Sequence, residues 1–210
     1  MLKSMTRARR QTAMKFKYRG RGGYREGAGR PKKIGAGVPH RPREKVNWRH
    51  PVHVTVRVRG DAAKMRSKAC FRAIAPALAA ARERFGFRLV HFSVQSNHLH
   101  FVAEAEDGKA LARGMQGLGV RVAKALNCAL GRRGNVFADR YHAHALRSPR
   151  EVAHAVAYVL RNAFIHAARA GKHIDPGAID PMSSAWERDA VVAPRTWLLR
   201  RGWLRFASAG

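Results

Sequence analysis

The stretch FRLVHFSVQSNHLHFVAEA, residues 87–105, decides the fold of this chain. Two largely apolar runs, residues 87–94 and 98–105, flank a turn-prone Gln-Ser-Asn, a pattern typical of two antiparallel strands with a short connection. His98 and His100 stand two apart on the second strand, so their side chains point to the same face. The stretch therefore predicts a strand pair that carries two imidazoles on one face.

The sequence on either side of this pair predicts further strands and helices. Alternating valines from Val52 to Val58 predict a half-buried strand, and NVFADRYHAHAL, residues 135–146, predicts another. Helical spacing of apolar residues predicts helices over residues 62–85, 109–130 and 149–171. The last of these begins with Ser-Pro-Arg-Glu, in which the serine is a helix N-cap. The order of these elements favours an α+β fold: an antiparallel sheet with helices mainly on one face.

The charge of the chain is extreme. Its 210 residues include 42 Lys and Arg against 13 Asp and Glu, a formal net charge of +29, which indicates a polyanionic partner. Hydrophobic residues still make up 46%, enough to build a core. No apolar stretch is long enough for a membrane span or a secretory signal, so we expect a cytoplasmic protein of the bacterial nucleoid without a membrane partner.

Composition divides the chain into three parts. Residues 1–49 hold 16 Lys and Arg against two acids and predict a disordered, DNA-binding basic arm, ahead of a main domain at residues 50–171. Within the arm, Arg30, Lys32 and Lys33 flank a proline as in an AT-hook, a minor-groove binder; the alternative is a polybasic tail held by phosphates alone. Residues 172–210 interleave basic and aromatic residues, which indicates either stacking on single strands or packing of the tryptophans onto the domain.

A second set of polar residues lies on the last predicted helix. Tyr158 and Asn162 are four residues apart and share one helix face. If that face covers the strand of His98 and His100, the site combines two imidazoles, one amide oxygen and a hydroxyl nucleophile. Mixed nitrogen and oxygen ligands suit Mg²⁺ or Mn²⁺ acting on a phosphate substrate.

Three motifs in this order resemble those of a known family. SNHLHFV at residues 96–102, GNVFADRY at residues 134–141 and YVLRN at residues 158–162 are similar to successive motifs of the single-tyrosine HUH transposases, and the REP-associated tyrosine transposases are the branch they resemble most. The resemblance covers roughly residues 50–170. It implies a ferredoxin-like sheet, commonly as a homodimer, that acts on single-stranded DNA beside a hairpin.

The resemblance also implies a role for each residue of the site. His98, His100 and Asn162 become the metal ligands, and Tyr158 becomes the nucleophile that leaves a 5′-phosphotyrosine link and a free 3′-hydroxyl. The implied activity is a transposase that cleaves and rejoins DNA strands. Family members commonly have proline after the helix asparagine, whereas this chain has Ala163, which predicts a longer helix.

Several alternatives stay open at this point. Tyr141 is a second candidate nucleophile. A non-catalytic nucleic-acid-binding protein on an inherited HUH fold, or a relaxase-like nicking enzyme, would share the same motifs. Basic residues outside the arm predict a DNA-binding groove: Arg121, Arg132, Arg133 and Arg140.

Overall fold

The computed structural model describes residues 44–62, 64–171, 173, 175 and 177–206. All of them belong to one unit of the chain, Gly37–Gly210. The AT-hook residues Arg30, Lys32 and Lys33 lie outside the described residues, as does nearly all of the basic arm.

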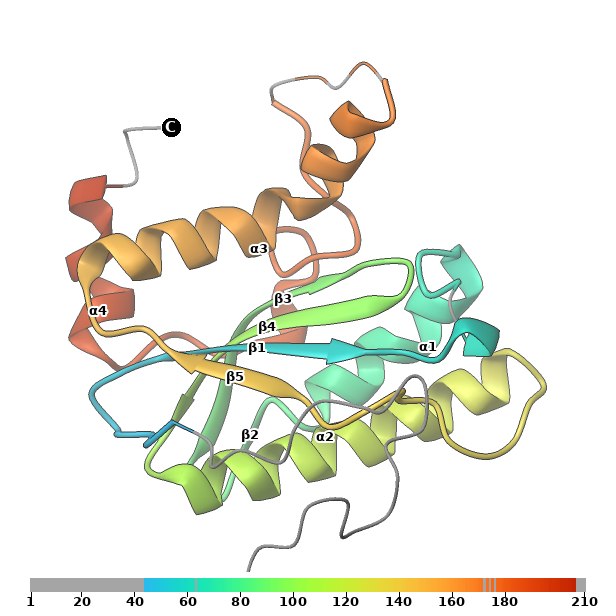
Figure 1. Ribbon diagram of the computed structural model, residues 1–210, viewed down its shortest axis with the longest axis horizontal. Helices are drawn as coiled ribbons and strands as arrows, with labels where there is room; N and C mark the ends of the chain where they lie inside the picture. The colour runs from blue at the N-terminus through green and yellow to red at the C-terminus, as the bar shows by residue number, and fades with distance from the viewer. Residues whose placement is uncertain (1–43, 63, 172, 174, 176, 207–210) are drawn as a thin grey trace, which may run out of the picture. The chain divides into compact units, whose positions relative to one another are not determined.

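A five-stranded antiparallel sheet forms the centre of this unit (Figure 1). In chain order its strands are β1 (Val52–Arg57), β2 (Glu83–Arg84), β3 (Phe87–Val94), β4 (His98–Ala105) and β5 (His142–Ala145), and in space they follow the order β2-β3-β4-β1-β5. Without the two-residue β2, the order β3-β4-β1-β5 is the ferredoxin-like arrangement. The predicted α+β class and the strand pair at residues 87–105 are therefore confirmed.

Helices cover both faces of the sheet. α1 (Lys68–Ala79) and α2 (Gly108–Ala129) lie on one face, where they pack on the valines of β1 and on Phe87, Phe92 and Phe101. α3 (Pro149–Arg169) and the short α4 (Trp197–Arg200) lie on the other (Figure 1). The prediction of helices mainly on one face thus holds for α1 and α2 but not for α3, whose apolar stripe packs on Val90 and Val102.

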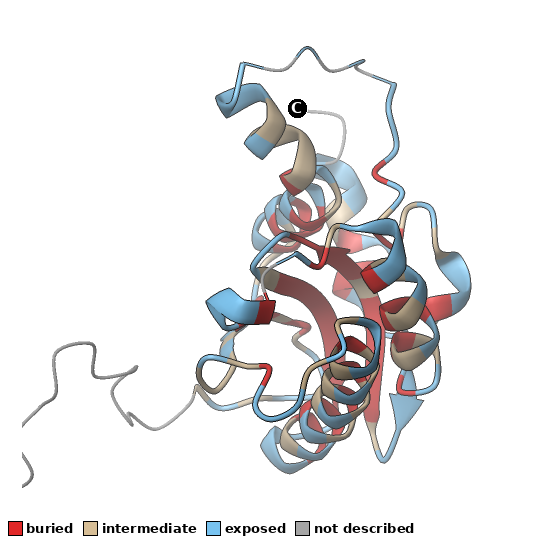
Figure 2. Ribbon diagram, turned by 90° about the vertical axis from the view of Figure 1, so that its right-hand side faces the viewer, coloured by how far each residue is buried: buried red, intermediate tan, exposed pale blue. Residues whose placement is uncertain are grey.

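Burial follows this layering. Figure 2 shows the buried residues concentrated in the strands and on the inward sides of the helices, with exposed residues on the outer sides. Short 3₁₀ helices at Gly60–Ala62, Arg188–Ala190 and Gly202–Phe206 complete the described elements. None of the helices in the described part of the chain has the length and apolarity that crossing a membrane requires.

Two predicted elements differ in extent from the structure. The helix expected over residues 62–85 spans only Lys68–Ala79, because Ser67 caps its first turn and the chain turns back through Phe85 and Gly86, both at positive φ, to pair β2 with β3. The helix continues through Pro76. The strand expected over residues 135–146 is reduced to β5, with one isolated bridge between Phe137 and Val58, the residue after β1.

The helix that carries Tyr158 begins and ends as predicted. Ser148 accepts a hydrogen bond from the Glu151 backbone N–H, and Pro149 occupies the first helical position. Ala163 continues the helix, which reaches Arg169. The asparagine at position 162 is therefore held inside a regular helix.

Segments at both ends of the described chain contact the sheet. Before the expected domain start, Glu44 accepts a hydrogen bond from the Ala145 backbone and pairs with Arg147. In the C-terminal segment, the buried Asp180 pairs with Arg66 through two hydrogen bonds. Of the tryptophans there, Trp203 packs beneath α3, and its indole N–H donates to the Leu199 carbonyl.

Candidate functional site

The two imidazoles of β4 lie on the face of the sheet that α3 covers. The antiparallel register with β1 places Thr55 opposite His100 and Arg57 opposite His98. Since alternate residues share a face, the polar positions of β1, including His53, lie on the same side as the imidazoles, while its valines enter the core against α1 and α2. One sheet face thus gathers polar side chains from two neighbouring strands.

Tyr158 completes a cluster of aromatic rings with these strands. Its ring meets His100 edge-on at a centroid distance of 5.1 Å and His53 at 6.0 Å. His98 and His100 are 4.6 Å apart by the same measure. Tyr158 is 40% exposed, whereas Asn162, one helical turn later, is only 1% exposed. The structure therefore brings a reachable phenol onto the imidazole pair.

Hydrogen bonds fix how the two imidazoles present their nitrogens. Nδ1 of His98 lies 2.6 Å from the Asn97 side-chain oxygen, which can only accept, so Nδ1 carries the proton and Nε2 keeps its lone pair. Nδ1 of His100 lies 3.2 Å from the Thr55 hydroxyl and 3.3 Å from Nε2 of His53. No residue in the part of the chain that the structure describes makes a hydrogen bond to Nε2 of either ring.

The environment keeps these histidines neutral. Burial, together with His98 and His53 nearby, lowers the pKa of His100 to about 3. Burial lowers the pKa of His98 as well, with smaller contributions from His166 and Arg57. A neutral imidazole offers a lone pair, which is the form that ligates a metal ion.

The donor set fits a divalent cation with open coordination positions. Nε2 of His100, whose lone pair can ligate a cation, is buried without a hydrogen-bond partner among the described residues. Nδ2 of Asn162 is also buried and unpartnered there; this N–H₂ group donates and suits a substrate oxygen, whereas the carboxamide oxygen of Asn162 would ligate the cation. Buried polar atoms of this kind call for a ligand. No group of three His, Cys, Asp or Glu side chains in the described residues converges to hold a metal, so Asn162 and substrate oxygens would have to complete the shell of the two imidazoles.

Comparison with solved structures bears on this geometry. A REP-associated tyrosine transposase bound to a REP hairpin superposes with a TM-score of 0.53 and 17% identity, over 75% of this chain and 93% of that one. The two chains share a fold. A presumed transposase from Deinococcus radiodurans R1 has a TM-score of 0.39, 14% identity and coverage of 68% and 99%.

A bacterial tRNA(His) guanylyltransferase-like protein in complex with GTP has a TM-score of 0.48 and 11% identity, over 70% of this chain and 76% of that one. This likeness and that to the Deinococcus protein are too distant to inform the fold. No protein-family model matches the chain, and no curated protein matches it either.

The second candidate nucleophile lies elsewhere. Tyr141 is partly buried against the core that α1 and α2 cover, on the opposite side of the sheet from His98 and His100. It also lines a cavity of about 430 Å³ beside α2. Of the two tyrosines in the main domain, only Tyr158 lies against the imidazoles.

The four arginines predicted to bind DNA lie in different parts of the structure and have different contacts. Arg121 donates to the Gly117 carbonyl on its own helix, α2. Arg132 pairs with Asp61 at 2.7 Å and donates to the Asn135 carbonyl. Arg133 is exposed in the following loop, and Arg140 is partly buried at the cavity that Tyr141 lines. The groove predicted from these four residues stays a prediction.

Residues that the sequence reasoning did not assign to the site also meet there. His53 and Thr55 contact His100, the exposed Arg57 lies beside His98, and the ring of His166 is 6.1 Å from that of His98. The alternation of β1 carries the signal, because His53, Thr55 and Arg57 are the polar positions between its valines. Their meeting with β4 depends on the strand order, which that pattern alone does not contain.

Proposed function

We propose that this protein is a metal-dependent DNA strand transferase that cleaves and rejoins single-stranded DNA near palindromic hairpins. The observation that carries the proposal is the edge-on packing of Tyr158 on His100, whose Nε2 is buried without a partner among the described residues. The fold shared with a tyrosine transposase that was solved on a hairpin supports it.

In the proposed reaction Tyr158 is the nucleophile. Its phenolic oxygen attacks the scissile phosphorus, and the phenol proton passes to solvent, which this half-exposed side chain reaches. The bond from phosphorus to the 3′-oxygen breaks, and that oxygen takes up a proton to become a free 3′-hydroxyl. The new 5′-phosphotyrosine ester retains an activated phosphate, so a 3′-hydroxyl can displace the tyrosine and rejoin a strand.

Three side chains would hold the cation, Mg²⁺ or Mn²⁺: His98 and His100 through Nε2, and Asn162 through its carboxamide. When bound, the cation polarises the scissile phosphate and offsets the charge that develops on it. Thr55 and His53 contact Nδ1 of His100, which orients that ring and leaves Nε2 for the ligand role.

Charge supports DNA as the partner. The chain carries +29, and the exposed Arg57 and Arg161 stand on β1 and α3, the two elements that flank the cluster. Both can contact the phosphates on either side of the scissile bond.

We also propose that the protein acts in the cytoplasm and that it forms a homodimer. Light scattering after size-exclusion chromatography tests whether it is a dimer.

The test is covalent capture of DNA. Labelled single-stranded hairpin oligonucleotides are incubated with the protein in Mn²⁺ or chelator and resolved on denaturing gels. We expect a shifted band that requires the metal, maps to Tyr158 and disappears in Tyr158→Phe. Tyr141→Phe is the matched control and should retain the adduct, because this tyrosine lies on the other side of the sheet. Equal adduct yield from Tyr158→Phe would overturn the proposal.

A further inference from the structure

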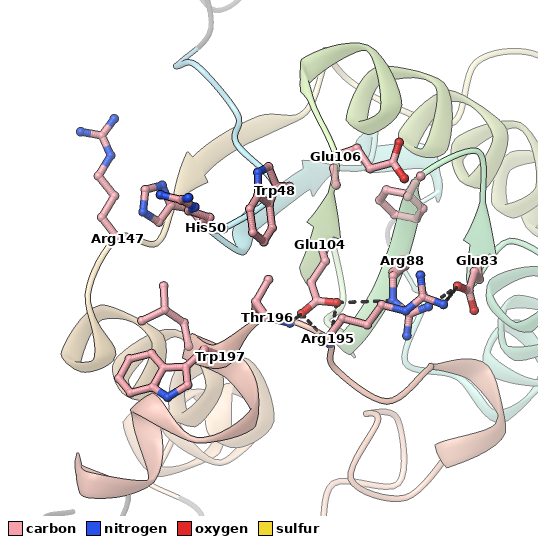
Figure 3. Close-up of a pocket in the computed structure, with 15 residues that line it drawn as sticks. Trp48, His50, Glu83, Arg88, Glu104, Glu106, Arg147, Arg195, Thr196 and Trp197 are labelled. Carbon is pink, nitrogen blue, oxygen red and sulfur yellow. Dashed lines mark hydrogen bonds and ion pairs between the residues drawn. The ribbon is translucent and has the colours of Figure 1, made fainter.

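One cavity lies apart from the tyrosine and histidine cluster. It measures about 780 Å³, within the range of about 300–1,000 Å³ typical of small-ligand sites. It is lined by the segment before β1, the far ends of β3 and β4, and the segment that leads into α4 (Figure 3). Its floor includes Glu104, four residues along β4 from His100, or about 13 Å.

Two tryptophans from distant parts of the chain line this cavity. Trp48 is 62% exposed and Trp197 is 58% exposed. The Trp197 ring packs so closely on Gly202 that a Cβ there would come within 2.7 Å of it, which holds the indole in place. The guanidinium of Arg49 lies 5.1 Å from the centre of the Trp48 ring. Two large aromatic surfaces thus line the cavity.

The carboxylates of the cavity differ in whether another residue already pairs with them. Glu104 accepts hydrogen bonds from the backbone N–H groups of Arg195 and Thr196, and Glu83 pairs with Arg88 and Arg195 (Figure 3). The carboxylate of Glu106 has no ion pair or hydrogen bond to a described residue. A ligand in this cavity therefore meets one available carboxylate inside it.

We infer that this cavity binds unpaired nucleobases of single-stranded DNA, with one base stacked on Trp48 and another on Trp197. Indole stacking combined with arginines that contact the backbone is how proteins bind single strands, and Arg49, Arg147 and Arg195 line the cavity. The Glu106 carboxylate accepts from an exocyclic amino group, so it favours adenine, cytosine or guanine over thymine. The inference deepens the proposed function and rests on it for the choice of DNA as ligand.

The test measures binding without strand cleavage. Fluorescent oligo(dA) and oligo(dT) of about 12 nucleotides are titrated with the full chain in chelator, and anisotropy gives each Kd. We expect Trp48→Ala to weaken oligo(dA) binding about 5- to 100-fold, the loss of one stacked base. Trp186→Ala is the matched control, because Trp186 is 65% exposed but does not line the cavity, and it should change Kd by less than about twofold.

Two further variants guard against misfolding and test the choice of base. Trp197→Phe keeps an aromatic ring over Gly202 and should still weaken binding, with unchanged circular dichroism. Glu106→Gln should reduce the preference for oligo(dA) over oligo(dT) about 3- to 10-fold, because a neutral amide oxygen accepts more weakly than a carboxylate and the new N–H₂ group can donate to thymine. Kd values within about twofold of wild type for both tryptophan variants would overturn the inference.

The outcomes separate this inference from the proposed function. Weakened binding by Trp48→Ala in a protein that attaches to no hairpin would support the cavity and contradict the strand transferase. If DNA attaches to Tyr158 in a metal-dependent way but the tryptophan variants bind oligonucleotides as the wild type does, the strand transferase would be supported and the nucleobase cavity contradicted. The separation of about 13 Å along β4 keeps the two sets of substitutions from touching the same groups.

Discussion

At one end of the sheet face under α3, Arg88 and Glu104 form a buried ion pair. Glu104 also accepts hydrogen bonds from the backbone N–H groups of Arg195 and Thr196. At the other end, about 13 Å away along β4, His100 and Asn162 are equally buried. Each of these two residues has a polar atom without a partner among the described residues.

The two ends differ in what faces their buried polar atoms. Arg88 Nε makes no hydrogen bond, but it lies 3.4 Å from the opposite charge of Glu104. Nε2 of His100 and Nδ2 of Asn162 have neither a hydrogen bond nor an ion pair among the described residues. Leaving a buried polar atom unpaired destabilises the fold by about 1–3 kcal/mol, so the second end favours a ligand more than the first. Glu104 fastens the C-terminal segment to the sheet. His100 presents an unpaired Nε2 and Asn162 an unpaired N–H₂ group, which under the proposed function meet a cation and a phosphate.

Arg88→Met should give the largest effect on stability. It leaves the Glu104 carboxylate buried without its cation, and breaking such a pair reduces the free energy of unfolding by about 3–5 kcal/mol. Urea denaturation measures the loss. Arg195→Met is the control: its side chain is 72% exposed and pairs with Glu83, so it should cost under about 1 kcal/mol. Equal losses in the two variants would contradict a structural role for this end.

His100→Ala should act on function. We expect adduct formation to fall more than about 100-fold, because a proposed metal ligand is removed. The same variant should lose the stabilisation by Mn²⁺, which for the wild type reaches about 2.7 kcal/mol at 100 times Kd. Thermal unfolding with and without Mn²⁺ measures it, and the exposed His154→Ala serves as control. An unchanged Mn²⁺ shift in His100→Ala would show that the cation binds elsewhere.

His91, on β3 between the two ends, should make stability depend on pH. Burial lowers its pKa from 6.5 to about 4, so below pH 6.5 the unfolded chain takes up a proton that the folded chain does not. Its contribution is complete above pH 6.5 and is lost towards pH 4 at up to about 1.4 kcal/mol per pH unit. His91→Gln should flatten the curve of unfolding free energy against pH over this window, as urea titrations would show. An unaltered slope would mean that other groups cause the acid sensitivity.

Ser148→Ala should give the smallest effect. It removes the side-chain cap of α3 and should cost about 1 kcal/mol of unfolding free energy. The lost cap is ten residues before Tyr158, so the adduct yield should stay at the wild-type level well below the melting temperature. A parallel loss of adduct would show that the first turn of α3 positions the nucleophile.

Local signals were enough to predict several elements of the fold. The alternation on β1, the two apolar runs of β3 and β4, and the Ser-Pro start of α3 depend on neighbouring residues only, and the structure confirms them. The first helix is shorter than predicted because its alanine-rich spacing continues past residue 79, whereas the positive φ at Phe85 and Gly86 belongs to a turn.

The site was predictable only where one strand or one helix carries it. His98 with His100, and Tyr158 with Asn162, follow from the periods of a strand and a helix. His53 and Thr55 were missed because polar positions on an alternating strand resemble a solvent-facing side, whereas in the structure both are partly buried and the Tyr158 ring of α3 meets His53. Trp48 was missed because the cavity that it lines is also formed by residues distant in the sequence, at the start of α4.

The sheet ends in short strands on both sides, two residues in β2 and four in β5. Long unpaired edges recruit strands from other molecules, and proteins commonly prevent this by shortening them. Under the proposed function, many copies of the protein lie close together along a nucleic acid. The brevity of β2 and β5 limits the growth of one sheet into the next and so protects crowded copies from aggregation.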